Sequence, residues 1–496
     1  MDEVDVQTLR NRLIVSYSGF LLMGVGITLF IPLLLIMAYP NEIVYAYSFV
    51  IPGLMALAGG FVLWRLFRVD PALAPLGRHQ ALILVGVFWV MACIFGATPF
   101  IISFILSPLD GIFEAVSGWT TTGLTMVDVT TCPHIFLFWR SLMQFIGGAG
   151  FAVLMLTALI GPKSGVASVY SAEARTERLL PAIRHTVRMI LWIYLLYLFV
   201  GIGLLYIAGM PLFDSINHSM CALSTGGFST KAGSIGAYQS LEIEIVAMVL
   251  MLLGSLSFAF HYLLLSGKLG KAAKDIELKV VYASVIIFLP IVTYSLVYSF
   301  YHSPLQGFRH ALFNVISALT TTGYMTTSSE NMHQFGHLVL FSLVVLMSVG
   351  GSTGSTAGGI KRYRIGIMAK SIFWEIKTRL LPESAVIGRT AWCTGEREII
   401  TPDLFMEVSI FVFAYITLYI TGIVVFLLSG YSVMDALFEY ASAMGTVGLS
   451  TGITGPTMPV SCKVMEIIGM ILGRLELWAV LILMATPFEW MVSRGR

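Results

Sequence analysis

Four short segments of this chain can be aligned with one another on a central glycine. Each has a small residue six positions before the glycine and an apolar residue directly after it. Thr-Thr-Thr-Gly occurs in two of them, Ser-Thr-Gly-Gly and Gly-Thr-Val-Gly in the others. One such motif would indicate no more than a turn, but four copies indicate an internal repeat. The central glycines are Gly123, Gly227, Gly323 and Gly448.

The chemistry of these segments is that of the backbone. Glycine permits a positive φ, which lets a loop turn its carbonyl groups inward. Four such loops around one axis would form rings of carbonyl oxygens, which can replace the hydration shell of a monovalent cation. The motifs contain no acidic side chain, which disfavours a filter for divalent ions. The predicted filter residues are Thr121, Thr122, Gly123, Thr225, Gly226, Gly227, Thr321, Thr322, Gly323, Thr446, Val447 and Gly448.

A polar residue stands nine positions before each glycine. This column holds Glu114, His218, Asn314 and Glu439. We expect these side chains to brace the short helices by hydrogen bonding. Direct ion binding remains the alternative, because carboxylates at membrane depth are functional candidates by default.

The elements that carry these loops are long apolar runs. Of the 496 residues, 57% are hydrophobic and 11% are charged, against roughly 25% charged in soluble domains. A span needs about 20 apolar residues, and the net charge of +2 gives no indication of nucleic-acid binding. The sequence predicts ten spans, at about 13–38, 44–65, 80–106, 136–161, 186–209, 240–266, 278–302, 336–370, 404–429 and 463–492.

The basic residues predict the orientation. Placed on these spans, 24 of the 29 Lys and Arg residues lie on one side of the membrane. Cytoplasmic loops carry such an excess, so both termini are expected in the cytoplasm. No removable signal peptide is expected, because the first twelve residues lack an apolar region ending in a cleavage site.

The predicted fold is an all-α polytopic membrane protein. It has four pseudo-symmetric helix–pore loop–helix repeats around one pore, preceded by two transmembrane helices. Non-helical backbone at membrane depth is tolerated only inside protein or beside a wet cavity, which fits pore loops. The expected divisions are 1–75 for the N-terminal extension, then 76–180, 181–272, 273–385 with a gating loop, and 386–496 for the repeats.

The eighth span contains a run of helix breakers. Each glycine costs a helix about 1 kcal/mol relative to alanine, so a straight helix is not expected here. A flexible loop across the pore would act as a gate, whereas a close helix-packing face is the alternative. The predicted gate residues are Gly350, Gly351, Ser352, Thr353, Gly354, Ser355, Thr356, Gly358 and Gly359.

Arg474 lies in the middle of the tenth span. A charge at that depth costs about 2.5–3.5 kcal/mol on insertion scales, so its side chain must find partners inside the protein. We expect carbonyl or hydroxyl groups of the Gly-rich loop to supply them, which would latch the gate. A structural ion pair is the alternative.

These motifs together resemble the Trk/Ktr/HKT superfamily of potassium transporters. The resemblance rests on the four loops, on Gly-Gly-Ile-Lys at 358–361 and on Gly-Arg-Leu-Glu at 473–476. The two extra N-terminal spans are similar to those of the TrkH-type subunits. The resemblance implies potassium in the filter, no further cofactor in this chain, and a homodimer with two pores. It also implies an inner-membrane location among lipids and a cytoplasmic nucleotide-binding partner of the TrkA type.

The sequence leaves alternatives for the transported ion and for the class of protein. In plant relatives a serine at the position of Gly123 is associated with sodium transport, so glycine here favours potassium. An ion-coupled secondary transporter of another solute and a sodium-permeable member of the superfamily are the other readings. An enzyme is not expected, because the spans show no nucleophile–base pair. The five cysteines lack metal-site spacing, although Cys132 and Cys462 both fall in predicted outer loops and could meet.

Overall fold

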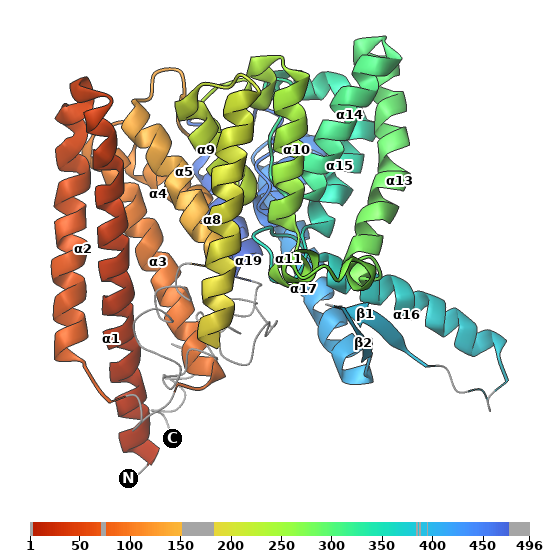
Figure 1. Cartoon of the computed structure of the whole chain (residues 1–496), viewed down its shortest axis with the longest axis horizontal. Coiled ribbons are helices and arrows are strands. Elements are labelled where there is room, and N and C mark those ends of the chain that lie inside the picture. The colour runs from red at the N-terminus through yellow and green to blue at the C-terminus, as the bar shows by residue number, and fades with distance from the viewer. Residues whose placement is uncertain are drawn as a thin grey trace.

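The fold is a bundle of long apolar helices, seen here in a computed structural model (Figure 1). The structure describes residues 3–70, 76–150, 183–382, 388–393 and 395–475, together with Ala385. Six helical segments in this part are long and apolar enough to cross a membrane. They are Gln7–Met37, Pro40–Leu66, His79–Ile102, Val187–Ile207, Ile276–Tyr301 and Pro402–Leu428. The predicted helical, polytopic fold is confirmed.

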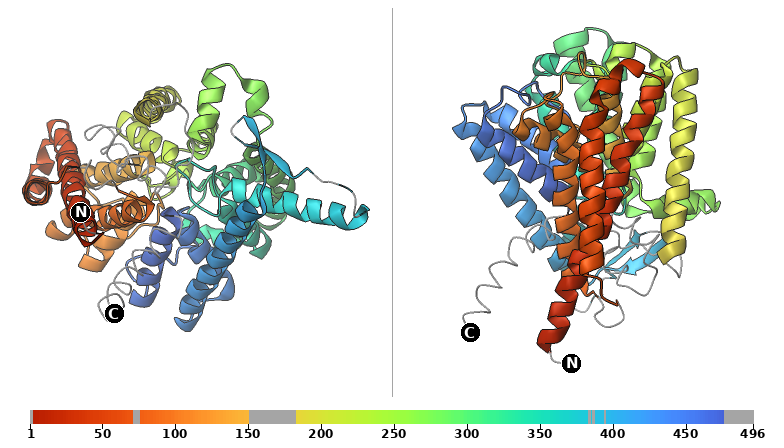
Figure 2. Two further views of the ribbon diagram at one scale, coloured as in Figure 1. Left: turned by 90° about the horizontal axis from the view of Figure 1, so that it is seen from below. Right: turned by 90° about the vertical axis from the view of Figure 1, so that its left-hand side faces the viewer.

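The first two helices form an antiparallel pair at one edge of the bundle (Figures 1 and 2). Helix α1 spans Glu3–Phe30 and α2 spans Ala46–Leu66, and the short 3-10 helices Ile31–Met37 and Pro40–Tyr45 join them. They pack closely at Gly19 and Gly60, where a Cβ on either glycine would meet the backbone of the other helix. Small residues permit this approach in membrane helices.

Four helices of 12–16 residues lie in the rest of the chain, each preceded by a helix of at least 21 residues and followed by another helix. Seen from below, the helices surround a common centre (Figure 2). The long helices that precede them are α3 (Arg78–Ile102), α8 (Ile183–Ile207), α13 (Ile276–Leu296) and α17 (Pro402–Leu428). The short helices are α4 (Pro108–Trp119), α9 (Leu212–Leu223), α14 (Pro304–Leu319) and α18 (Val433–Gly445). The helices that follow are α5 (His134–Ala149), α10 (Leu241–Ser255), α15 (His337–Val349) and α19 (Val460–Arg474).

Two of the expected spans are broken. The run 240–266 was expected to be one span, but α10 ends at Ser255 and α11 (Phe258–Leu265) leaves it at 108°. Leu256 has an extended backbone and Ser257 caps the next helix, so the break needs no glycine. In the eighth span α15 ends at Val349 and α16 (Arg362–Leu380) begins after the Gly-rich tract. The last parts of spans four and ten lie outside the described residues.

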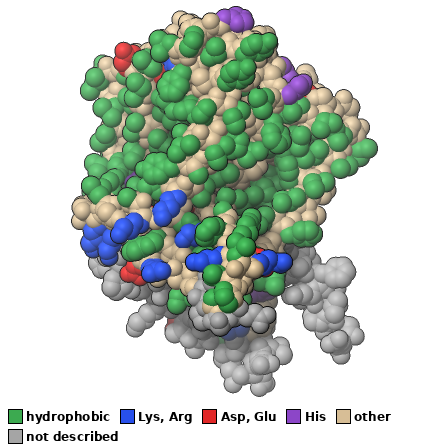
Figure 3. Space-filling model, turned by 90° about the vertical axis from the view of Figure 1, so that its right-hand side faces the viewer, with side chains coloured by type: hydrophobic (Ala, Val, Ile, Leu, Met, Phe, Trp, Pro, Cys, Tyr) green, Lys and Arg blue, Asp and Glu red, His purple; other side chains and the backbone are tan. Residues whose placement is uncertain are grey.

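The end of the molecule at α16 also carries a β-hairpin that the sequence analysis did not anticipate. Strands β1 (Thr390–Cys393) and β2 (Glu396–Ile399) pair antiparallel, with Thr390 opposite Ile399. The short α12 (Leu269–Ala272) lies between α11 and α13 in the chain. Lysine and arginine side chains gather at this end, below a broad hydrophobic surface (Figure 3). This distribution agrees with the charge bias read from the sequence.

Further short elements lie at the opposite end of the molecule. They are the 3-10 helices Ser234–Tyr238 and Ser329–Phe335 and the single π-helical turn Val297–Tyr301. The short helices that start near this end are buried along most of their length, each within the ring of longer ones. Their C-terminal ends therefore meet in the interior, where the four glycine-centred loops lie.

Candidate functional site

The four short helices end in the same way. A threonine two positions before each central glycine adopts a positive φ of 51–58°. In each case the N–H of this threonine bonds the carbonyl five residues before the glycine, and the next N–H bonds the carbonyl six before it. Glycine normally occupies this left-handed position, and a β-branched residue there is strained. The four threonines are Thr121, Thr225, Thr321 and Thr446.

The central glycines bring the four loops together in a ring. All four have a positive φ, from 74° to 96°. A Cβ on Gly123 would meet the carbonyl oxygen of Gly226, and a Cβ on Gly227 that of Thr322. Likewise Gly323 faces the carbonyl oxygen of Val447, and Gly448 faces that of Thr122. Each loop thus presents the carbonyl before its glycine to the glycine of a neighbour, and the series closes on itself.

A chamber of about 240 Å³ opens on the side of the ring away from the helix ends. All four central glycines line it, together with Asp128, Ser450 and Thr454. The exposed Asp128 carboxylate accepts hydrogen bonds from Thr130, both the hydroxyl and the N–H, and these lower the pKa of the carboxyl. A charged carboxylate at this entrance raises the local concentration of cations.

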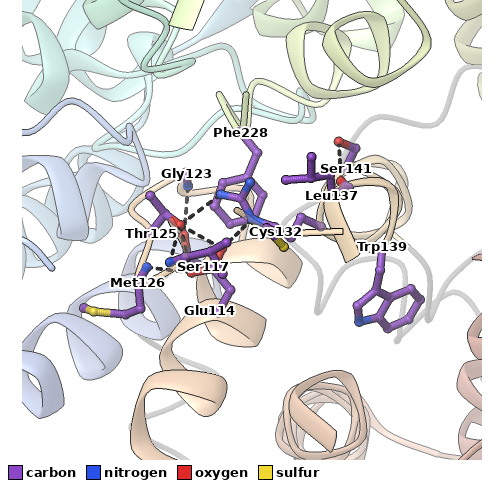
Figure 4. Close-up of polar contacts among 12 residues, drawn as sticks. Glu114, Ser117, Gly123, Thr125, Met126, Cys132, Leu137, Trp139, Ser141 and Phe228 are labelled. Atoms are coloured by element: carbon purple, nitrogen blue, oxygen red, sulfur yellow. Dashed lines mark hydrogen bonds and ion pairs between the residues drawn. The ribbon is translucent and has the colours of Figure 1, made fainter. Parts of the chain in front are cut away.

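The first loop is braced by a buried ion pair. Nε of Arg140 lies 2.6 Å from the carboxylate of Glu114, and both side chains are buried. The same carboxylate accepts from the Thr125 hydroxyl and from the Met126 N–H at 2.7 Å (Figure 4). Arg140 also donates to the carbonyl of Ser229, so it joins the first loop to the second. Here the polar column braces its loop as expected.

The fourth loop repeats this brace without an arginine. One oxygen of Glu439 accepts from the Ser450 hydroxyl and from the N–H and hydroxyl of Thr451, at 2.7–2.9 Å. Its other oxygen accepts from Thr454 at 2.7 Å. These bonds to Glu439 all come from the loop that follows α18, and Thr454 also contacts Glu466 of α19.

The second and third loops are held by different contacts. His218 contacts the Ser229 hydroxyl at 3.0 Å. Asn314 instead bonds its own helix at His310, and its side-chain oxygen lacks a hydrogen-bond partner among the described residues. The Tyr324 hydroxyl donates to the carbonyl of His218. The expected brace is therefore present in three loops, and the third loop relies on its neighbour.

Two sets of contacts in the ring were missed by sequence reasoning. Gln144 donates to the carbonyl of Gly226 at 2.7 Å and accepts from the N–H of Phe228, although it belongs to α5 of the first segment. The hydroxyls of Ser117 and Ser442 accept from the N–H groups of Gly123 and Gly448 at 3.0 Å. The sequence shows these serines only as small residues of their column, in which the second loop has Cys221.

The Gly-rich tract between α15 and α16 is an ordered loop. The N–H of Gly351 bonds the carbonyl of Gly358, and a positive φ lets Gly350 and Gly359 bring their backbones into contact. Thr353 donates its N–H to the buried carboxylate of Glu277 at 2.7 Å. The other tract residues, Ser352, Gly354 and Ser355, complete a compact turn with a bond from the Ser355 hydroxyl to the carbonyl of Ser352.

This loop lies directly against the ring of strained threonines. The Thr356 hydroxyl contacts that of Thr225 at 3.1 Å and donates to the carbonyl of Gly254 at 2.9 Å. The hydroxyl of Thr321 accepts from the N–H of Gly358, and that of Thr121 reaches the carbonyl of Thr356. A Cβ on Gly358 would collide with the hydroxyl of Thr446. The loop therefore contacts all four segments at once.

Two arginines anchor the loop through backbone carbonyls. Arg474 donates to the carbonyl of Thr356 at 2.5 Å and to that of Gly147 at 2.7 Å. Arg362 is fully buried and donates to the carbonyls of Ser255 and Leu319 at 3.0–3.3 Å. Sequence reasoning singled out Arg474 but not Arg362, which it counted only as one more cytoplasmic charge. The acceptors are main-chain groups, which residue types alone do not reveal.

Metal sites and disulfides are two further features that the described residues could contain. No cluster of three or more His, Cys, Asp or Glu that could hold a metal occurs in the part of the chain that is described. All five cysteines are free in the structure, so Cys132 and Cys462 are not paired there.

The geometry defines a polytopic membrane protein with a central ring of re-entrant loops. The chain matches the family model TrkH, described as a cation transport protein, over residues 49–491, and it belongs to that family. It is 33% identical to an uncharacterized cation transporter of Methanocaldococcus jannaschii, covering 96% of this chain and 95% of that one. It is 30% identical to the Trk system potassium uptake protein TrkG of Escherichia coli, covering 98% of this chain and 100% of the relative.

The fold is also similar to a solved structure. The crystal structure of the potassium transporter TrkH from Vibrio parahaemolyticus superposes with a TM-score of 0.82 at 26% identity. The match covers 95% of this chain and 98% of that chain.

The buried pair that braces the first loop predicts a large stability effect. Replacing Arg140 by Met leaves the Glu114 charge buried and unpaired, which costs about 3–5 kcal/mol. Arg379→Gln, in the exposed pair with Glu375, should cost less than about 1 kcal/mol. The unfolding midpoints of both variants in detergent measure the difference. Equal midpoints would show that the Arg140 contact contributes no more than a surface pair.

Proposed function

We propose that the chain takes up potassium across the membrane, through a selectivity filter formed by the four glycine-centred loops. The observation that carries the proposal is the closed ring in which each glycine meets a carbonyl of the neighbouring loop. The potassium transport named for its relatives supports the choice of ion. Potassium is the transported ion, and the proposed chemistry needs no resident cofactor.

The filter would select by backbone oxygens and not by charge. Carbonyl rings suit a weakly hydrated monovalent cation, and the C-terminal ends of α4, α9, α14 and α18 carry partial negative charge toward it. The proposed ligands come from Thr121, Thr122 and Gly123 and from the matching positions of the other loops. Glycine at 123 favours potassium over sodium.

The Gly-rich loop would be the gate. Its Thr356 lies against the inner side of the ring and bonds the first, second and fourth segments through Thr121, Thr225 and Arg474, which supports a closed position. Arg474 would hold this position through the Thr356 carbonyl and place a positive charge below the filter. Release of the loop would clear the path for the ion.

The proposed setting is the cytoplasmic membrane, with both termini inside the cell. The gathered Lys and Arg side chains at the α16 end support this orientation (Figure 3). A homodimer and a nucleotide-binding partner of the TrkA type are proposed by analogy with the Trk systems of the relatives. The partner would act from the cytoplasm, where α16 and the β-hairpin project.

Ion flux in proteoliposomes tests the function directly. We expect uptake of potassium and rubidium to exceed that of sodium, with and without a cytoplasmic partner protein. Equal sodium flux would favour the sodium-permeable alternative. Flux that requires a second solute or a proton gradient would favour a coupled transporter.

One filter glycine can be compared with a matched glycine elsewhere. Gly323→Ala places a methyl group where the Val447 carbonyl lies, and we expect potassium flux to fall at least tenfold. Gly430 also has a positive φ, of 91°, but open space surrounds it. Gly430→Ala should keep flux near the unmodified level at a backbone cost of about 1–2 kcal/mol. Rubidium uptake by both variants measures the effect, and equal losses would argue against the filter assignment.

The gate predicts gain of flux. Arg474→Ala removes the bonds to Thr356 and Gly147, so the loop should leave the ring more often and flux should rise several-fold. A variant with the 350–359 loop shortened should behave alike, whereas Arg397→Ala in the exposed hairpin should not. Unchanged or reduced flux in both gate variants would contradict the gate.

A further inference from the structure

The helix that follows each of three loops carries a charged residue at nearly the same place. Arg140 and Glu244 stand 17 residues after their central glycines, and Glu466 stands 18 after Gly448. Arg140 pairs with Glu114 at 2.6 Å. Glu244 accepts two bonds from Arg309 at 2.7 and 2.9 Å. Two of these three positions are therefore neutralised by an opposite charge.

Glu466 has no oppositely charged partner among the described residues. Its side chain is fully buried, and its recorded hydrogen bond joins one oxygen to the Thr454 hydroxyl at 3.0 Å. The other oxygen has no hydrogen-bond partner among the described residues. An ionised carboxylate left in this condition is strongly disfavoured, so the site needs either a cation or a proton.

Among the described residues, the charged groups packed around Glu466 are engaged with other partners. Lys463, one turn away, donates to Asp110 of α4 at 2.5 Å and to the carbonyl of Pro456. The loop 449–459 contains no titratable residue. Arg474, on α19 itself, donates to the carbonyls of Thr356 and Gly147. The other titratable residues described on the packed elements are Asp, Glu, Cys and Tyr: Asp110 and Glu114 on α4, Asp403, Glu407, Tyr415 and Tyr419 on α17, Tyr431 after it, Asp435, Glu439 and Tyr440 on α18, and Cys462 on α19.

The hydrogen bonds around Thr454 have one consistent direction. Its hydroxyl lies 2.7 Å from an oxygen of Glu439 and 3.0 Å from an oxygen of Glu466, but it has a single proton to donate. The other oxygen of Glu439 already accepts three bonds, as an ionised carboxylate does. The series of hydrogen bonds is complete if the Glu466 carboxyl donates its O–H to the Thr454 hydroxyl and that hydroxyl donates to Glu439.

We propose that Glu439 and Glu466 form a proton-binding site behind the fourth loop, with one proton on Glu466 linked through Thr454 to the Glu439 carboxylate. Binding adds a proton from water to the Glu466 carboxylate and forms the neutral acid. Thr454 lines the chamber above the ring, so it connects the site to the outer solution.

The site is connected to the ring through the backbone. Ser450 and Thr451, which bond Glu439, follow directly on Gly448 and Leu449. Loss of the proton would leave two buried like charges on either side of Thr454, and their repulsion would displace the segment that carries the fourth glycine. Proton occupancy would thereby set ion flux, a consequence that depends on the proposed function whereas the proton site itself does not.

Infrared spectroscopy of the full chain in lipid detects the proton. Glu466→Gln is nearly isosteric with the neutral acid and should fold. The spectrum of the unmodified protein minus that of Glu466→Gln should contain the C=O stretch of one protonated carboxyl, shifted in D2O. The matched control is Glu244→Gln, which removes an ion-paired carboxylate and should leave that band unchanged. The measurement is made in saturating potassium.

Potassium flux measured at different external pH values is the second test of the proposal. Potassium flux through the unmodified protein should change with external pH between about pH 5 and pH 9, and Glu466→Gln should lose most of that change. Absence of the protonated carboxyl band from the difference spectrum would overturn the proposal. A band that appears only after potassium is removed would also overturn it, because a bound cation would then neutralise Glu466 instead of a proton. If neither the unmodified protein nor the variants carry potassium flux, the proposed function is refuted. The infrared result would still decide whether the proton site exists.

Discussion

The structure depends on the close approach of each central glycine to a carbonyl group of the neighbouring loop. No side chain fits at these four positions, and the positive φ excludes one for a second reason. The approach also places threonines in a left-handed conformation, at a cost of about 1–3 kcal/mol each. The buried braces at Glu114, Glu439 and Gln144 are the contacts that hold the loops in this strained arrangement.

Much of this arrangement could be read from the sequence because repetition amplifies a weak signal. A single glycine motif has many explanations, but four aligned copies between apolar runs predict pore-type loops and a polar column that braces them. The interruption at Gly350–Gly359 was also legible, since glycine acts on the backbone of its own helix. Such local effects depend on residue type, so they appear in the sequence directly.

What escaped prediction depends on contacts between distant segments. Gln144 reaches a loop 82 residues away, and Arg362 reaches carbonyls of α10 and α14. The 108° bend after Ser255 is likewise set by the loop that packs against it, because the Ser255 carbonyl accepts from Ser352 and Arg362. The third loop departs from the common brace because Met325 replaces the hydroxyl residue found in the other loops.

Arg362, which is fully buried, and Arg474, which is partly buried, donate most of their hydrogen bonds to main-chain oxygens. Their acceptors include the carbonyls of Gly147, Ser255 and Thr356. Almost any substitution of a residue keeps its main-chain carbonyl. Mutational scanning would therefore detect the two donor arginines and overlook the residues whose carbonyls accept. These anchors can therefore be released by displacement of the acceptor backbone in α5, α10, α14 or the loop, or by movement of the arginines themselves. Substitution of the acceptor residues leaves these arginine–carbonyl bonds in place, so the anchors tolerate sequence change at those positions.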